Sequence, residues 1–386
     1  MNPAFIPWAL SGGAAVTVGF ARFGYALILP AMQSDLSLTY AQAGWLNTSN
    51  SLGYLLGSIM TVLYVSRLGN HRLFVAGLLI TTLSLLANGL VSNFYLLNVI
   101  RFITGVAGAW AFICGGVLAS VLGSRAIVIY FGGGGSGMLL TGTTLPWLFE
   151  LYGAQAWPWA WMGTALICTP VTIAALAAAR YSVEPGTPDQ KAPWSWRACS
   201  KAFLAYFMFG LGYIAYMTFI VAWVRGHTSP AWSMAATTSV MWSILGVMSI
   251  LAPTVWARLF HGRTNGVPMA AAMTTLGIGA ILPLLLPNLA GIWLSAALVG
   301  VSVFMVPSAV TGFVKGNLAP GAWGSALAAA TTLFALGQTI GPAAAGWVSD
   351  VTGSLSTGLS LSAAILFAGA LLALSQQPIM KTAAAH

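Results

Sequence analysis

Two arginines stand inside apolar stretches of the chain, and they have the clearest potential for chemistry. Arg22 lies near the middle of the apolar run 5–32, in the segment GFARFGYALILP, and Arg101 lies early in the run 96–122. An arginine keeps its charge in any protein environment. At the centre of a membrane helix it costs roughly 2.5–3.5 kcal/mol by insertion scales, so it is expected to face a protein interior or a wet cavity. A carboxylate, which can bind a guanidinium through two hydrogen bonds, is a suitable ligand.

The acidic residues all lie at predicted helix ends or in loops, and no Asp, Glu or His falls deep within an apolar run. They are Asp35, Glu150, Glu184, Asp189 and Asp350. Neither arginine therefore has an evident counter-ion in the protein, which favours an anionic substrate as the counter-ion. The alternative, which weighs more for Arg101 than for Arg22, is a structural arginine that hydrogen-bonds carbonyl groups or bridges helices.

Polar and aromatic side chains that could shape such a site recur at helical spacing. Tyr25 lies three residues after Arg22, and Asn50 and Tyr54 belong to a polar stripe along the next apolar run. The stripe comprises Asn47, Asn50, Ser51, Tyr54, Ser58 and Thr61. The other candidates for substrate contact are Tyr213, Tyr216, Trp110, Trp242 and Gln338. For each of them the alternative is packing or interhelical hydrogen bonding.

The composition indicates that membrane-spanning helices position these side chains. The chain has 386 residues, of which 58% are hydrophobic and only 5% charged. A soluble domain carries about 25% charged residues, so we predict an all-α, polytopic membrane protein. Twelve apolar runs are long enough to cross about 30 Å of hydrocarbon. They cover about 5–32, 41–65, 73–93, 96–122, 126–150, 157–180, 201–225, 231–257, 266–287, 290–314, 323–348 and 356–376.

The distribution of lysine and arginine predicts the orientation. With the N-terminus inside, the outer loops hold only Arg225, and both termini are expected to be cytoplasmic. The inner loops and tail hold Arg67, Arg72, Arg125, Arg180, Lys191, Arg197, Lys201, Arg258, Arg263, Lys315 and Lys381. These residues form no basic patch interleaved with aromatic residues, so nucleic acid is excluded as a partner.

The chain divides into two similar halves. The polar segment 181–200 is the longest connection, and we expect it to link a six-helix bundle, residues 1–180, to a second one, residues 201–386. Arg67 matches Arg258, Gly105 matches Gly300, and the segment from Glu150 to Gly153 matches that from Asp350 to Gly353. In the same register Arg22 matches Tyr213, and Tyr25 matches Tyr216. These matches predict a parallel repeat of six plus six helices.

Several motifs resemble those of the major facilitator superfamily. They are RLGNHR at 67–72, RFITGVAG at 101–108 and GQTIGP at 337–342. The stretch with Arg22 and Pro30 resembles the YbfB/YjiJ-type bacterial branch. The resemblance implies a central cavity between the two bundles and a place in the bacterial cytoplasmic membrane. The glycines from Gly132 to Gly137 lie within a span and have no following lysine, so we interpret them as sites of close helix contact and hinge bending and not as a phosphate loop.

These features predict a secondary transporter that moves a small organic anion by alternating access. Its expected partners are the lipid bilayer and the solute, and it is expected to be a monomer. Protons or a counter-substrate are further possible partners, because exchange, uniport and proton symport all stay open. The alternative function is efflux of drugs or other amphiphiles, and a receptor or channel is a third class. No nucleophile–base or metal constellation points to an enzyme. Cys114, Cys168 and Cys199 form no CxxC, and no cofactor is expected.

Overall fold

The chain folds into twelve long helical segments, as a computed structural model shows for residues 3–182, 192–227 and 232–379. The first segment is composite: α1 (Ile6–Ala14) continues through a π-helix, η2 (Ala15–Phe23), into α2 (Gly24–Asp35). The tenth is broken into α11 (Leu289–Val303) and α12 (Met305–Asn317). Short 3-10 turns, η1 (Pro3–Phe5) and η3 (Ala154–Ala156), precede α1 and α7. The other segments are α3 (Tyr40–Leu68), α4 (Asn70–Leu90), α5 (Phe94–Val121), α6 (Ser124–Tyr152), α7 (Trp157–Ala179), α8 (Trp196–Arg225), α9 (Met234–Phe260), α10 (Val267–Leu285), α13 (Pro320–Thr352) and α14 (Leu355–Leu374).

Each predicted span corresponds to one of these segments. Within the described part of the chain, ten of them are long and apolar enough to cross a membrane by length and composition. The other two, α6 and α13, are 29 and 33 residues long and run with the rest of the bundle. The fold is therefore the predicted all-α membrane fold.

Two details differ from the prediction. The span 290–314 is interrupted at Phe304, because Pro307 has no N–H to donate to the Val303 carbonyl in a continuous helix. The segment 181–200 was expected to be a linker throughout, but α8 begins at Trp196, where the Trp196 ring packs 5.7 Å from the Phe203 ring. The middle of that segment, with Glu184, Asp189 and Lys191, lies outside the described residues, as does Lys381.

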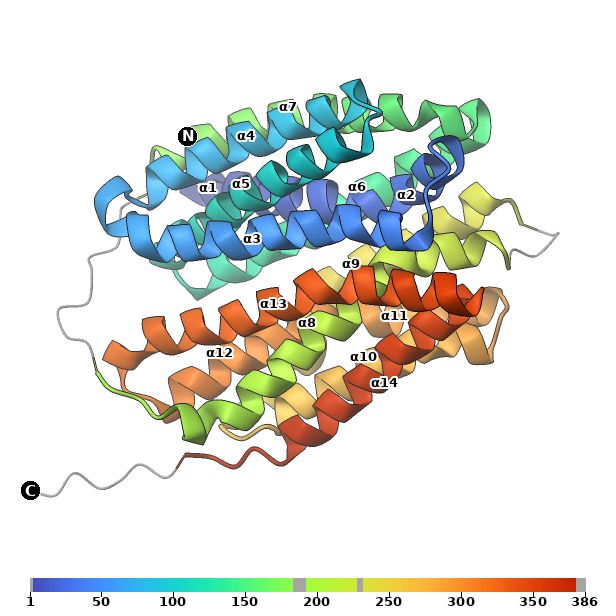
Figure 1. The fold of residues 1–386 in the computed structure, drawn as a ribbon. Coiled ribbons are helices and arrows are strands. Elements are labelled where there is room, and N and C mark those ends of the chain that lie inside the picture. The colour runs from blue at the N-terminus through green and yellow to red at the C-terminus, as the bar shows by residue number, and fades with distance from the viewer. Residues whose placement is uncertain (1–2, 183–191, 228–231, 380–386) are drawn as a thin grey trace, which may run out of the picture.

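The helices form two stacked groups. Figure 1 shows α1–α7, in blue to green, above α8–α14, in yellow-green to red. We call the first group the N-terminal half and the second the C-terminal half. Because α3 and α13 lie where the two halves face each other, a side chain on either helix can contact both halves.

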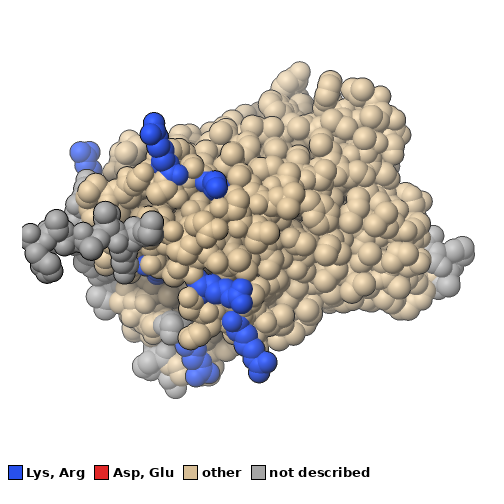
Figure 2. All heavy atoms as spheres, turned by 90° about the horizontal axis from the view of Figure 1, so that it is seen from below, with Lys and Arg blue, Asp and Glu red and all other residues tan. Residues whose placement is uncertain are grey.

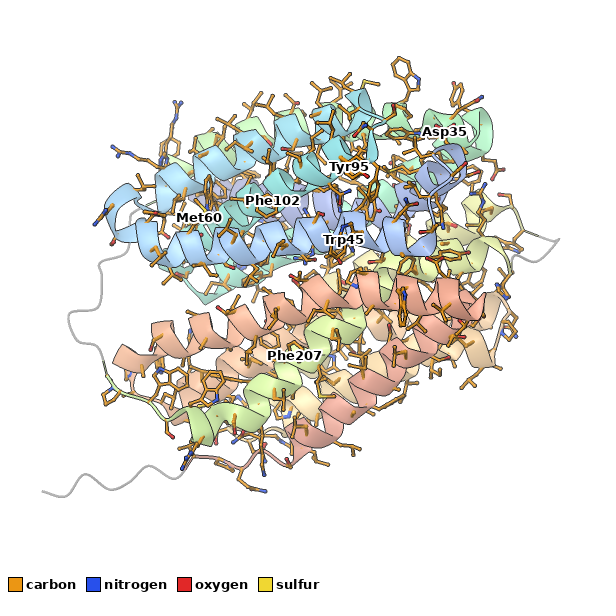
Figure 3. All side chains as sticks on the ribbon, in the orientation of Figure 1. Asp35, Trp45, Met60, Tyr95, Phe102 and Phe207 are labelled. Carbon is orange, nitrogen blue, oxygen red and sulfur yellow. The ribbon has the colours of Figure 1, made fainter. Side chains whose placement is uncertain are left out.

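The charged residues distinguish the two ends of the bundle. Lysines and arginines gather at one end, on the left in Figure 2, which we call the basic end. It comprises Arg67, Arg72, Arg125, Arg180, Arg197, Lys201, Arg258, Arg263 and Lys315. The opposite end, here the acidic end, carries Asp35, Glu150 and Asp350. Figure 3 shows Asp35 at this end, on the right, and Met60 of α3 toward the basic end.

The halves touch backbone to backbone halfway along α6 and α9, and again nearer the acidic end, where α3 meets α13. A Cβ at Gly135 of α6 would lie 2.7 Å from the Gly246 carbonyl oxygen, and one at Gly246 of α9 would lie 2.8 Å from that of Gly135. Gly44 of α3 packs in the same way on the backbone of Pro342 in α13. Glycine is needed at these positions because any side chain would push the two halves apart.

Two carboxylates fasten the halves together at the acidic end. The Asp350 carboxylate, on α13, accepts hydrogen bonds from the first two backbone N–H groups of α3, those of Tyr40 (3.0 Å) and Ala41 (2.7 Å). Glu150, on α6, accepts one from the backbone N–H of Ala235 at the start of α9 (3.1 Å). Each carboxylate lies at a helix N-terminus, where the helix dipole favours negative charge. Glu150 and Asp350 are matched in the predicted repeat, so these carboxylate clasps are related by the pseudo-symmetry of the halves.

Candidate functional site

A cavity of about 650 Å³ lies between the halves. It extends from Arg22 to the basic end, where the exposed side chain of Lys315 also lines it. Most of its wall is apolar and aromatic, with Phe23, Phe112, Phe131, Trp256 and Phe304 among the lining residues. Its volume is in the range of small-molecule binding sites, about 300–1,000 Å³. Toward the acidic end the glycine contacts and the carboxylate clasps close the bundle.

Arg22 reaches the inner end of this cavity and contacts both halves. Its side chain is only 8% exposed. Nη2 donates to Oγ of Ser51 in α3 (3.3 Å) and to Oε1 of Gln338 in α13 (2.6 Å), and the guanidinium carbon lies 5.0 Å from the centre of the Tyr54 ring. Nε is buried without a hydrogen-bond partner among the described residues. The charge is thus held by neutral groups only, with donor capacity left over.

The backbone around Arg22 is shaped by close helix packing. Arg22 belongs to the π-helix η2. This type of helix is rare in proteins, and where it occurs it often lies at a functional site. A Cβ at Gly19 of η2 would lie 2.5 Å from the Gly137 Cα and 2.7 Å from the Gly134 carbonyl oxygen. The glycine segment of α6 therefore allows η2 to lie directly on the α6 backbone, as the sequence predicts.

Four nearly parallel rings form one wall of the cavity. Tyr206, Phe209 and Tyr213 come from α8 and Phe334 from α13, and all four line the cavity. Tyr206 and Phe334 have ring centroids 4.6 Å apart, and Phe209 and Tyr213 4.5 Å apart, with planes within 9° in each pair. We call these four residues the aromatic wall. Offset parallel stacking of this kind is a favourable arrangement of aromatic rings.

Gln338 connects Arg22 to the aromatic wall. Its Oε1 accepts the hydrogen bond from Arg22, and its Nε2 donates to the Tyr213 hydroxyl. Arg22 and Tyr213 are matched in the predicted repeat, so equivalent positions of the two halves meet at one amide. We call this arrangement the Gln338 bridge.

Arg101 lies apart from the cavity. It is 1% exposed, and its Nη1 donates to the Ala21 carbonyl of η2 (3.0 Å). Its guanidinium carbon lies 4.3 Å from the centre of the Tyr25 ring and 5.6 Å from that of Trp161. Buried cation–π contacts of this kind contribute roughly 2 kcal/mol or more when the cation is desolvated. The geometry corresponds to the structural alternative, in which Arg101 holds η2 against α5.

The ten predicted site residues thus separate into two groups. Arg22, Tyr54 and Tyr213 line the cavity, and Gln338 lies directly behind them. The others make contacts elsewhere in the bundle; these are Arg101, Tyr25, Asn50, Tyr216, Trp110 and Trp242.

These other residues are mostly engaged with neighbouring helices. The Tyr25 hydroxyl donates to the Ala43 carbonyl (2.8 Å), Asn50 Nδ2 donates to the Arg101 carbonyl (3.1 Å), and the Tyr216 hydroxyl is 2.6 Å from Ser295 Oγ. Trp242 is fully buried against Gly142, where α6 meets α9. Trp110 is half-buried against the core. The polar stripe of α3 likewise bonds to neighbouring helices, as in the contact from Asn47 Nδ2 to Thr218 Oγ1 (2.6 Å).

Among the cavity-lining residues that the sequence reasoning missed, four are used in the description of the site: Tyr206, Phe209, Phe334 and Lys315. A signal for three of them exists. Tyr206 and Phe209 precede Tyr213 at spacings of seven and four, which places them on one face of α8, and Phe334 lies four residues before Gln338. The fourth, Lys315, holds its Nζ 5.5 Å from the centre of the Trp323 ring.

Comparison with known proteins identifies the family and the fold. The family model MFS_4, described as "Uncharacterised MFS-type transporter YbfB", matches residues 14–374. A comparison with curated protein sequences gives no match.

Solved structures similar to this chain include the nucleoside transporter NupG, with 14% identity over 97% of this chain and 99% of that one and a TM-score of 0.71. A bacterial homologue of the human lysosomal transporter Spinster, described as inward-facing and occupied, has 15% identity over 96% of each chain and a TM-score of 0.70. At such identities the likeness shows the fold alone.

Proposed function

Since the chain belongs to the family of MFS-type transporters typified by YbfB and so moves a solute across a membrane, we propose that the solute is a small organic anion whose carboxylate binds Arg22. The observation that carries this proposal is the environment of the Arg22 guanidinium. It is buried between the halves at the inner end of the cavity, and only neutral groups bond to it. A carboxylate would supply the missing charge through hydrogen bonds that are roughly twice as strong as neutral ones.

The electrostatics of the cavity support an anion. Arg22 and Lys315 are both cationic and line the cavity at its two ends. The acids among the described residues, Asp35, Glu150 and Asp350, all make hydrogen bonds at the acidic end. A transporter of cations would be expected to place a carboxylate beside its substrate, and none of these three lines the large cavity.

The proposed transport cycle is alternating access between the N-terminal half, α1–α7, and the C-terminal half, α8–α14. The excess of lysine and arginine at the basic end favours a cytoplasmic location for that end and for both termini. On this assignment the cavity is open to the cytoplasm of a bacterium, and the carboxylate clasps close the periplasmic side. A monomer is sufficient for this cycle.

A second candidate is efflux of amphiphiles. The large apolar cavity wall favours it, because flexible apolar compounds gain affinity from buried area alone. The two functions differ in their need for a negative charge. Flux into proteoliposomes with and without a pH gradient would in addition distinguish proton symport from exchange or uniport.

The proposal is tested with Arg22→Ala and a matched control, Arg258→Ala. Arg258 is exposed at the basic end and does not line the cavity, so its replacement removes the same charge elsewhere. The purified variants are screened against a panel of carboxylates, including acetate, succinate and benzoate, by thermal shift. A ligand at 100 times its Kd stabilises the folded state by about 2.7 kcal/mol.

We expect at least one carboxylate to stabilise the wild type and Arg258→Ala but not Arg22→Ala. Truncating one partner of a buried charge pair costs about 2–5 kcal/mol, so the affinity should fall by about 30-fold or more. Equal stabilisation of Arg22→Ala and the wild type would refute the proposal.

A further inference from the structure

We infer that the transported anion is an aromatic monocarboxylate, whose planar ring lies against the aromatic wall while its carboxylate binds Arg22. The inference rests on the proposed function and deepens it, because it names the chemical class of the substrate. It is carried by the position of the aromatic wall relative to the buried cation.

The aromatic wall is a stack of offset, nearly parallel rings, which the flat ring of a ligand can extend. Neighbouring rings along it, Tyr206–Phe209, Phe209–Phe334 and Tyr213–Phe334, have planes within 12° of each other, with centroids 5.5–5.9 Å apart. All four rings line the cavity although each is at least nine-tenths buried. The rings therefore have little freedom to move, and an added ring can join the stack without a large loss of side-chain entropy.

The wall ends beside the cation. Tyr213 is its last ring, and the Gln338 bridge places the Tyr213 hydroxyl one amide group away from the Arg22 guanidinium. On the α3 side of the guanidinium lies the Tyr54 ring, 5.0 Å from the guanidinium carbon to the ring centre. When the carboxylate of a ligand reaches Arg22, the part of the ligand next to the carboxylate therefore lies near Tyr54 of the N-terminal half and Tyr213 of the C-terminal half.

The charge at this point matches one carboxylate. Both hydrogen bonds that Arg22 makes to described residues use Nη2, and Nε is buried without a partner. Among the residues that the structure describes, Arg22 is the one buried cation beside the wall, since Lys315 is exposed at the basic end and faces Trp323. A neutral ring compound would leave the cation unpaired, and an aliphatic acid would leave the wall without a stacked partner.

The test uses the purified full-length protein and three ligands of similar shape. Benzoate has the ring and the charge, cyclohexanecarboxylate has the charge without the aromatic ring, and benzamide has the ring without the charge. Affinities are measured by isothermal titration. Because an aromatic pair is favourable beyond the area that it buries, we expect benzoate to bind about fivefold more tightly than cyclohexanecarboxylate. Benzamide should show no measurable binding.

A pair of variants tests the location. Phe334→Leu removes one ring of the aromatic wall, and Phe131→Leu removes a phenylalanine that lines the cavity outside the wall. The preference for benzoate should disappear in Phe334→Leu and persist in Phe131→Leu. The comparison of ligands on the wild type needs no variant, so it stands even where Phe334→Leu fails to fold.

The outcomes separate the two proposals. If benzoate and cyclohexanecarboxylate bind equally and both require Arg22, the anion proposal stands and the aromatic substrate is refuted. If the preference for benzoate is the same in Phe334→Leu as in the wild type, the role of the wall is refuted. If no carboxylate binds, or if binding is independent of Arg22, both proposals fail.

Discussion

Removing the carboxylate clasps should shift the transporter away from the conformation in which the two halves are closed at the acidic end. Asp350 and Glu150 each bond from one half to a helix N-terminus of the other. These bonds cannot persist once the halves separate at the acidic end. Their free energy therefore counts only toward the state that is closed there, and the change to test is Asp350→Ala together with Glu150→Ala.

The expected size follows from the contacts. Loss of a helix-capping side chain costs about 0.5–2 kcal/mol, and the charge at the helix terminus adds about 0.3–1 kcal/mol. Asp350 binds two N–H groups and Glu150 one, so Asp350→Ala should have the larger effect, about 1.4 kcal/mol, or tenfold in the closed-to-open equilibrium. The double variant should shift the equilibrium by roughly 2 kcal/mol, about 30-fold.

A cysteine reporter measures this equilibrium. Ala31 is buried and lines a smaller cavity of about 250 Å³ near the acidic end, together with Glu150 and Arg225. The native cysteines Cys114, Cys168 and Cys199 are all buried, so Ala31→Cys should provide the reactive thiol. Its rate of maleimide labelling should rise about tenfold with Asp350→Ala and about 30-fold in the double variant, because the rate follows the open population.

The matched control is Asp35→Ala. Asp35 lies at the same end and carries the same charge, but its carboxylate accepts from Trp157 Nε1 (2.7 Å), within the N-terminal half. Its loss leaves both carboxylate clasps in place, so labelling should stay close to the wild-type rate. If the double variant labels no faster than Asp35→Ala, the clasps do not stabilise the closed state and the reasoning is wrong.

Two further predictions concern the packing around Arg22. Arg101→Met removes the contacts with Ala21, Tyr25 and Trp161, and we expect it to lower stability by about 2 kcal/mol while benzoate binding is kept; a wild-type melting temperature in detergent would contradict this. Gly19→Ala should destabilise by about 1–3 kcal/mol, since its Cβ would overlap the α6 backbone, whereas Gly24→Ala, with Thr141 Cγ2 at 3.5 Å, should be neutral or stabilising. Equal melting temperatures for the two alanine variants would refute that account.

Hydropathy and charge were sufficient to predict the helices, because a membrane span requires a long apolar run with its backbone bonded internally. The break at Phe304 was not predictable from hydropathy, since the run 290–314 is apolar on both sides of it. A proline within a membrane helix often leaves the helix continuous, so Pro307 alone does not indicate a break.

The site was predictable in part. The cost of a buried charge pointed to Arg22 directly, but the spacing rule that grouped Tyr25 with it assumes 3.6 residues per turn. Arg22 belongs to the π-helix η2, where the winding is wider, and Tyr25 lies beyond it against Arg101. The hydrogen bonds of Arg101 depend on which helices pack together, which no local pattern in the sequence contains.

The Gln338 bridge has a consequence for the strength of binding. The amide oxygen of Gln338 accepts a hydrogen bond from Arg22 Nη2. An incoming carboxylate that accepts a hydrogen bond from Nη2 must displace the Gln338 amide oxygen. The measured affinity through this donor is then the difference between a charged acceptor and a neutral one. Ligand affinity is thereby reduced relative to a bare guanidinium, which favours release of the solute after each passage. Gln338 belongs to the C-terminal half and Arg22 to the N-terminal half, so the same displacement also breaks one hydrogen bond between the halves.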